Sequence, residues 1–238
     1  MDAEPDSESF WSLFKLNLQV KFRNFKEFWR IVFRFYPNRM FCQQDLYLLS
    51  LYLWQNPFKI SKEFLLNSGA ADPYAYGETP LTTFAQIAEA CQVTAKDTLV
   101  ELGCGRGRSC FWLHCFYGCR VIGIDFVPLF IEKAQKVKER YHLESLEFRC
   151  EDMLTSHFDE GTIFYLYGTC LDDEVIRKLI DKFCKLPSGT KIITVSYPLN
   201  DYTRKPQFSV LRELRLPFTW GEGVVYIQEL IPTLKQSR

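Results

Sequence analysis

Segments typical of strands and helices alternate along the chain after residue 70. The expected strands are apolar and span residues 98–102, 120–124, 146–149, 162–167 and 191–196. The expected helices between or before them span residues 81–90, 107–116, 128–141 and 171–185. This alternation requires right-handed crossovers and therefore a mostly parallel sheet.

The chain beyond Pro206 has a different pattern. Two β segments, residues 208–216 and 224–231, flank Gly221-Glu222-Gly223, and the simplest arrangement for them is a hairpin. We therefore predict an α/β fold with a Rossmann-like, mostly parallel seven-stranded sheet that ends in a C-terminal antiparallel hairpin.

The N-terminal part of the chain is aromatic and basic. Residues 11–40 carry seven Lys or Arg against a single acid, Glu27. At helical spacing one face collects Phe22, Phe25, Trp29, Val32, Phe33 and Tyr36, and a neighbouring face collects Arg23, Lys26, Arg30 and Arg34. Pro37-Asn38 should end this helix. We predict two parts: an N-terminal helical, basic-aromatic appendage (1–70) and a catalytic domain (71–238).

Three roles remain open for the appendage. It could dock on its own domain as a lid, bind an acidic partner or nucleic acid, or make peripheral contact with an anionic membrane through residues 10–40. The width of its apolar face favours docking on its own domain. Neither apolar stretch in it approaches the roughly 20 uncharged residues that cross a bilayer, so we expect no transmembrane helix.

A glycine-rich turn joins the first expected strand to the following helix. It reads Val100-Glu101-Leu102-Gly103-Cys104-Gly105-Arg106-Gly107. Its glycines allow a sharp bend and let a ligand lie against the backbone at a helix N-terminus. A dinucleotide fingerprint would need its third glycine at position 108, where the chain has Arg108. Glu101 would repel a pyrophosphate and attract a cation, which favours S-adenosylmethionine (SAM), a sulfonium with an α-ammonium group.

Acids also follow the next two strands. Asp125 lies about 20 residues beyond the turn, the offset expected for a ribose ligand, and we include the adjacent Phe126 in the predicted site. Glu151-Asp152-Met153 follows the third strand; Asp152 could accept from the adenine amino group, and Met153 could pack on its ring. Ligands of such sheets bind at the carboxyl ends of the strands, so these acids support SAM as the cofactor.

The segment Tyr74-Ala75-Tyr76-Gly77-Glu78-Thr79, together with the glycine turn, resembles the non-SET histone-lysine methyltransferases of the disruptor-of-telomeric-silencing family. The resemblance covers about residues 71–231 and implies a class I SAM-dependent methyltransferase. It implies that Tyr76 and Thr79 hold the methionine end of SAM, that Glu101 with Gly103, Gly105 and Gly107 forms its bed, and that Asp125 takes the ribose.

The chain departs from this family at three places. Glu101 replaces an Asp, and Arg108 replaces a Gln near the cofactor carboxylate. The family's Asn pair after the fourth strand is absent, since residues 165–170 read Tyr-Leu-Tyr-Gly-Thr-Cys.

The resemblance makes a protein lysine the leading methyl acceptor. A lysine must be neutral to attack, and burial among aromatic side chains favours its neutral form. We predict Tyr167, Tyr226 and Trp220 as the residues around the transferred methyl group. A small molecule, an RNA and a catalytically inactive SAM-binding module remain alternatives.

Cysteine and histidine usage indicates a reducing compartment and no metal. The chain has nine Cys without regular spacing and only three His, and we expect free thiols in the cytoplasm, with peripheral membrane association left open. The cluster of Cys104, Cys110, Cys115, Cys119 and His114 matches no zinc signature. The oligomeric state does not follow from these features.

Overall fold

The computed structural model describes residues 7–70 and 72–232, with the side chains of 7–17, 19 and 24 excepted. Its helices are α1 (Ser7–Phe35), α2 (Arg39–Ser50), α3 (Pro57–Asn67), α4 (Leu81–Cys91), α5 (Arg108–Tyr117), α6 (Pro128–Arg140), α7 (Asp173–Phe183) and the short 3₁₀ helix η1 (Leu199–Tyr202). Its strands are β1 (Thr98–Leu102), β2 (Arg120–Asp125), β3 (Leu146–Cys150), β4 (Ile163–Leu166), β5 (Lys191–Val195), β6 (Phe208–Phe218) and β7 (Gly221–Leu230).

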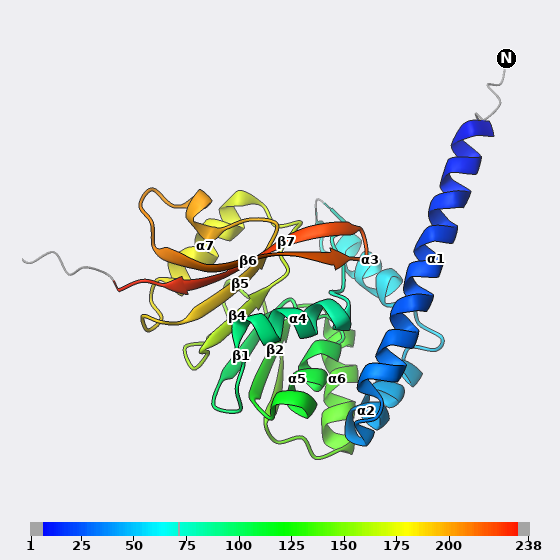
Figure 1. The fold of residues 1–238 in the computed structure, drawn as a ribbon, viewed down its shortest axis with the longest axis horizontal. Coiled ribbons are helices and arrows are strands. Elements are labelled where there is room, and N and C mark those ends of the chain that lie inside the picture. Colours follow the sequence, from blue (N-terminus) through cyan, green and yellow to red (C-terminus); the bar gives the residue numbers. More distant parts are fainter. Residues whose placement is uncertain (1–6, 71, 233–238) are drawn as a thin grey trace, which may run out of the picture.

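The strands form one seven-stranded sheet in the order β3-β2-β1-β4-β5-β7-β6 (Figure 1). Strands β1 to β5 run parallel to one another, whereas β7 runs antiparallel to both β5 and β6. The expected Rossmann-like sheet with a C-terminal hairpin is therefore confirmed, and the hairpin is inserted so that β7 lies beside β5.

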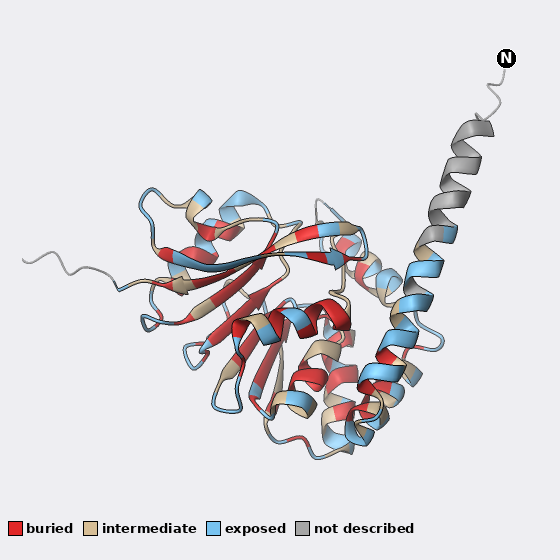
Figure 2. Ribbon diagram, in the orientation of Figure 1, coloured by how far each residue is buried: buried red, intermediate tan, exposed pale blue. Residues whose placement is uncertain are grey.

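Two apolar cores cover the two faces of this sheet. Successive strand residues point to opposite faces, so Leu99 joins one core and Val100 joins the other. The first core contains side chains of α4, α5 and α6, and the second contains those of α7. Figure 2 shows the central strands mostly buried, in red. Burial on both faces explains why these strands are almost continuously apolar.

The appendage is packed against the domain through its helical hairpin. Phe35 of α1 and Phe41 of α2 are buried in the first core, where both rings lie against Phe116 of α5. Asn38 begins α2 by accepting from the Phe41 N–H, and its amide also donates to the Cys115 carbonyl. Residues 35–48 thus share a core with the domain rather than forming a separate unit.

The face of α1 that packs inward differs from the widest apolar face of its sequence. Glu27, Ile31 and Phe35, spaced by four residues, turn toward the domain, and Ile31 and Phe35 are buried. Both carboxylate oxygens of Glu27 accept from Thr82, at 3.1 Å from its N–H and 2.7 Å from its hydroxyl. This cap on α4 and the buried pair set the rotation of α1, so the predicted aromatic face remains outside. No helix within the described residues combines the length and apolarity that a bilayer span requires.

Candidate active site

A cavity of about 550 Å³ lies at the carboxyl ends of β1 and β4, under helix α1. Its lining comes mainly from α1, residues 77–83, residues 101–109 and residues 217–219, together with Leu49, Phe58, Tyr165 and Tyr167. The predicted Thr79, Glu101, Gly103, Gly105 and Tyr167 are among its lining residues. The chain therefore brings its glycine turn and its Tyr-Gly-Glu-Thr segment together around one space.

The backbone of the glycine turn has a conformation that residues with a side chain rarely adopt. Gly103, Gly105 and Gly107 have φ angles of 79°, 53° and 73°, all left-handed. A Cβ on Gly107 would lie 2.6 Å from the Phe148 ring. The N–H groups of Gly103 and Cys104 donate to the Ile124 carbonyl, which ties the turn to β2. The loop is thus a bare, fixed backbone surface at the floor of the cavity.

Glu101 is a buried acid without a cationic partner. It is 6% exposed and accepts from the Ser109 hydroxyl at 2.7 and 2.6 Å and from the Cys110 thiol at 3.2 Å. Burial raises its pKa to about 7 against these hydrogen bonds, with Asp125 and Glu78 adding to the rise. Among the described residues no Lys or Arg pairs with it, so this carboxylate can accept a cation from a ligand.

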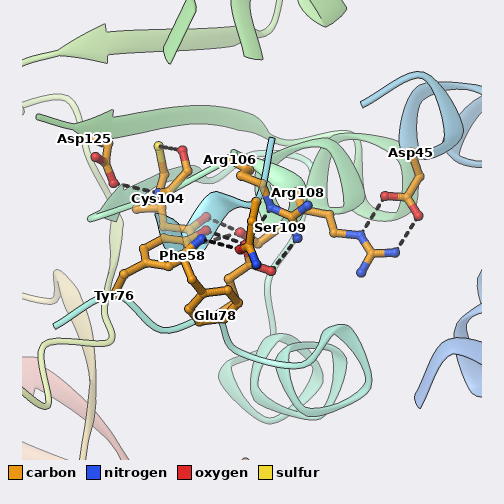
Figure 3. A network of polar contacts seen from close by, with 12 residues as sticks. Asp45, Phe58, Tyr76, Glu78, Cys104, Arg106, Arg108, Ser109 and Asp125 are labelled. Carbon is orange, nitrogen blue, oxygen red and sulfur yellow. Dashed lines mark hydrogen bonds and ion pairs between the residues drawn. The ribbon is translucent and has the colours of Figure 1, made fainter. Parts of the chain in front are cut away.

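A second acid, Glu78, is already paired (Figure 3). Its two oxygens accept from Arg106 Nε and Nη2, both at 2.6 Å, and the Tyr76 hydroxyl donates to it as well. Burial opposes ionisation of Glu78, but the Arg106 charge and these donors outweigh it, so its pKa lies below the ordinary value. The Tyr76 ring covers Gly105, with 3.0 Å between its edge and an added Cβ. The Tyr76 ring thus lies over the turn, whereas the Thr79 hydroxyl forms a hydrogen bond with the Tyr165 hydroxyl of β4 at 2.5 Å.

Arg108 is paired with the appendage rather than directed to a ligand carboxylate. Its Nε and Nη2 donate to the Asp45 carboxylate of α2 at 2.7 and 2.6 Å. The Tyr36 hydroxyl donates to the same acid at 2.9 Å, and the Asp45 side chain is fully buried. This bidentate pair joins α2 to the start of α5 next to the cavity.

The cavity lining does not include the remaining predicted cofactor residues, which are Tyr76, Gly107, Asp125, Phe126, Glu151, Asp152 and Met153. Asp125 accepts from the N–H groups of Gly105 (2.7 Å) and Val127 (2.9 Å), so its carboxylate supports the turn. Burial raises the Asp125 pKa, opposed by these backbone donors. Phe126 is 41% exposed and packs edge-on against Phe64 of α3.

The acids that follow β3 form local contacts. The Asp152 carboxylate accepts from the Leu154 N–H at 2.8 Å, and the Glu151 carboxylate accepts from the Ser156 hydroxyl. Met153 packs at the edge of the second core. The strand ends thus place all the predicted acids at one edge of the sheet, but only Glu101 among them lines the enclosed space.

Aromatic side chains form the opposite wall of the cavity. Tyr167 lines it, and its hydroxyl accepts from Trp220 Nε1 at 2.7 Å. Trp220 is half exposed and stacks on Phe218, with ring centroids 5.4 Å apart. Tyr226 lies on β7 in register with Thr194 and is not among the lining residues. Of the three predicted acceptor-side residues, Tyr167 and Trp220 therefore come together and Tyr226 does not join them.

Sequence reasoning did not select the residues that complete this site. Glu78 and Arg106 belong to the two recognised motifs, so an acid in one and an arginine in the other were a usable signal. Asp45 gave none, because it lies 63 residues before Arg108 in an appendage without a motif.

Comparison with known proteins assigns the fold and the domain. Residues 99–186 match the family described as "Methyltransferase domain". Over 156 residues the chain is 28% identical to a histone-lysine N-methyltransferase, H3 lysine-79 specific, of Dictyostelium discoideum, an alignment that covers 59% of this chain and 8% of that protein. Over 123 residues it is 32% identical to a sterol 24-C-methyltransferase of Kluyveromyces lactis, covering 50% and 31%. The chain thus spans less than a third of the length of these relatives.

A solved structure supports the same fold. An RNA methyltransferase from Salinibacter ruber, in complex with S-adenosyl-L-homocysteine, superposes with a TM-score of 0.54 at 24% identity and covers 67% of this chain and 97% of that one. The domain implies SAM as its cofactor. The glycine turn, which exposes backbone without side chains, and Glu101, which has no cationic partner among the described residues, both fit SAM. Residues 99–186 thus match a methyltransferase domain, within a chain that has the Rossmann-like fold of SAM-dependent methyltransferases.

Proposed function

We propose that the chain binds SAM across its glycine turn and transfers the methyl group to an acceptor that enters the cavity from the aromatic wall. The unpaired, buried Glu101 carries this proposal, because a carboxylate at this depth gains most from a ligand that brings its own positive charge. When bound, SAM supplies an activated methyl carbon. The protein has then to hold, orient and desolvate the two reactants.

We propose a protein lysine side chain as the acceptor. The support comes from the Tyr76–Thr79 segment and from the relative in Dictyostelium discoideum, whose name states lysine specificity. Tyr167 and Phe218 would surround the amine with aromatic surface, which lowers the pKa of a lysine and increases its neutral, nucleophilic fraction. The hydrogen bond from Trp220 fixes the Tyr167 hydroxyl, so this phenol can orient the amine.

One observation favours a second class of acceptor. Arg23, Lys26 and Arg30 of α1 contribute to the cavity wall, and none of them forms an ion pair with a described residue. Three cations in the cavity wall suit an anionic small molecule or an RNA better than a protonated lysine. An anionic acceptor is therefore the alternative function that the test must distinguish.

Calorimetry with SAM tests cofactor use. We expect the wild-type chain to bind SAM and Glu101→Gln to bind it at least about tenfold more weakly, since a charge-assisted contact contributes roughly 1.5–3 kcal/mol. Glu89→Gln is the matched control, because Glu89 is exposed on α4 and outside the cavity. The absence of both heat and a thermal shift with the wild type would support an inactive binding module instead.

Labelled SAM identifies the acceptor. The purified chain is incubated with labelled SAM and either core histones, total RNA or a lysate of its own host. Label that survives ribonuclease, is lost on proteolysis and appears as methyllysine after acid hydrolysis supports the lysine proposal. Label in the ribonuclease-sensitive or small-molecule fraction contradicts it and favours the anionic acceptor. Unchanged turnover in both Tyr167→Phe and Tyr167→Ala would exclude Tyr167 from the acceptor site.

A further inference from the structure

The outward face of α1 displays large aromatic side chains. Phe22, Phe25 and Phe33 are 58%, 58% and 74% exposed, and Trp29 is 42% exposed. Their rings contact one another along the helix, with Phe25–Trp29 and Trp29–Phe33 centroids 6.1 and 5.5 Å apart. A continuous exposed aromatic strip of this kind is unusual on a soluble surface and indicates an interaction site.

Basic side chains border the same strip. Lys21, Lys26, Arg30 and Arg34 are exposed, and the Lys26 ammonium lies 4.4 Å from the centre of the Phe22 ring. The one acid of this segment, Glu27, is turned inward and holds Thr82. The outward face of α1 from residue 21 to residue 34 is therefore aromatic and positively charged, with no exposed acid in it.

An open groove of about 940 Å³ continues this face onto the domain. It runs between the strip and Thr82 and Gln86 of α4, and it ends at Pro217 of β6. Lys26, Arg30, Thr82 and Pro217 line both this groove and the cofactor cavity, so the cavity adjoins the exposed face. Figure 1 shows α1 running along one side of the domain, outside the sheet and the helices that cover it.

The charge pattern of this face favours an anionic bilayer over a second copy of the chain as its binding partner. A second copy in a two-fold dimer would place the same cations against each other, with no exposed acid on the strip to neutralise them. An amphipathic helix with aromatic residues on one side and Lys or Arg beside them lies instead in the interface of an anionic bilayer, where tryptophan is also favoured. We propose that the outward face of α1 binds an anionic lipid bilayer, with Phe22, Phe25, Trp29 and Phe33 at the level of the headgroups.

Flotation of the full chain with unilamellar vesicles tests this proposal. Vesicles of phosphatidylcholine with about 30 mol% phosphatidylserine are compared with phosphatidylcholine alone. We expect binding to the anionic vesicles, weakened by added salt, and a blue shift of tryptophan fluorescence on binding. Lys21→Gln/Lys26→Gln/Arg34→Gln should lower the partition coefficient roughly a hundredfold, at about fivefold per charge near such a surface.

Two further variants keep the interpretation unambiguous. Lys96→Gln/Arg204→Gln/Lys205→Gln removes three exposed cations from loops outside α1 and should bind like the wild type. Phe22→Gln/Phe25→Gln/Phe33→Gln changes only exposed side chains and should lose binding while retaining the thermal transition of the wild type. Absence of wild-type flotation, equal binding by all variants, or a solution dimer that the phenylalanine variant dissociates would each overturn the proposal.

Discussion

Replacing Glu101 by Gln should stabilise the free protein against unfolding and should weaken its binding of SAM. The carboxyl is buried, and its pKa is raised from 4.5 to about 7, so the folded state holds this proton more tightly than the unfolded state. For an acid with a raised pKa, the contribution to stability is complete below the unfolded value and is lost as the pH rises through the folded value. At about pH 7.5 nearly the whole shift is expressed, which corresponds to about 3 kcal/mol at 1.36 kcal/mol per unit.

Glu101→Gln avoids this pH-dependent loss of stability because the amide does not ionise. We expect the free variant to unfold at a higher temperature than the wild type, by about 5–10 °C near pH 7.5 for a chain of this size. The advantage should shrink by about 2 kcal/mol at pH 5, because the folded carboxyl is then protonated and the unfolded carboxyl is only partly ionised. Urea unfolding at the two pH values measures it directly, with Glu89→Gln as the control.

The same titration should control cofactor affinity. If the ionised carboxylate receives the α-ammonium of SAM, the binding-competent fraction rises from about 0.1 at pH 6 to about 0.8 at pH 7.5. The Kd for SAM should then fall about eightfold over this range, equivalent to about 1 kcal/mol, and the Kd of Glu101→Gln should stay constant. A wild-type Kd that does not change with pH, together with equal pH dependence of unfolding in both proteins, would contradict the assignment of Glu101.

Three other substitutions have defined consequences. Asp45→Ala should cost about 3–5 kcal/mol in urea unfolding, because it leaves the Arg108 charge buried without its partner. Gly107→Ala should lower the free energy of unfolding clearly more than Gly118→Ala. Both glycines have left-handed φ angles, but only a Cβ on Gly107 would meet a ring, at 2.6 Å. Equal losses in chemical unfolding would exclude this contact as the cause. Trp220→Phe removes the hydrogen bond to the acceptor-side tyrosine, so it should raise the KM for the acceptor and leave the calorimetric Kd for SAM unchanged.

The amino-acid pattern alone determined the sheet and the bend at its centre. Apolar segments of strand length alternate with segments of helical periodicity, and this pattern predicts a parallel sheet. The glycines around Gly221, between two β segments, predict a hairpin. The glycine turn was predictable for the same local reason: residues with a Cβ rarely adopt φ near 50–80°, so three glycines in five residues, Gly103, Gly105 and Gly107, indicate a tight turn.

Which side chains meet in the site depends on how the folded chain packs. The Glu78–Arg106 pair spans 28 residues and the Asp45–Arg108 pair spans 63, distances over which sequence periodicity carries no information. Periodicity also gave the spacing of the aromatic residues on α1 but not its rotation, which Glu27 and two buried side chains fix. For Asp125 the strand end was predictable, whereas its choice of the Gly105 N–H was not, because a carboxylate bonds whichever donor the assembled loops bring within reach.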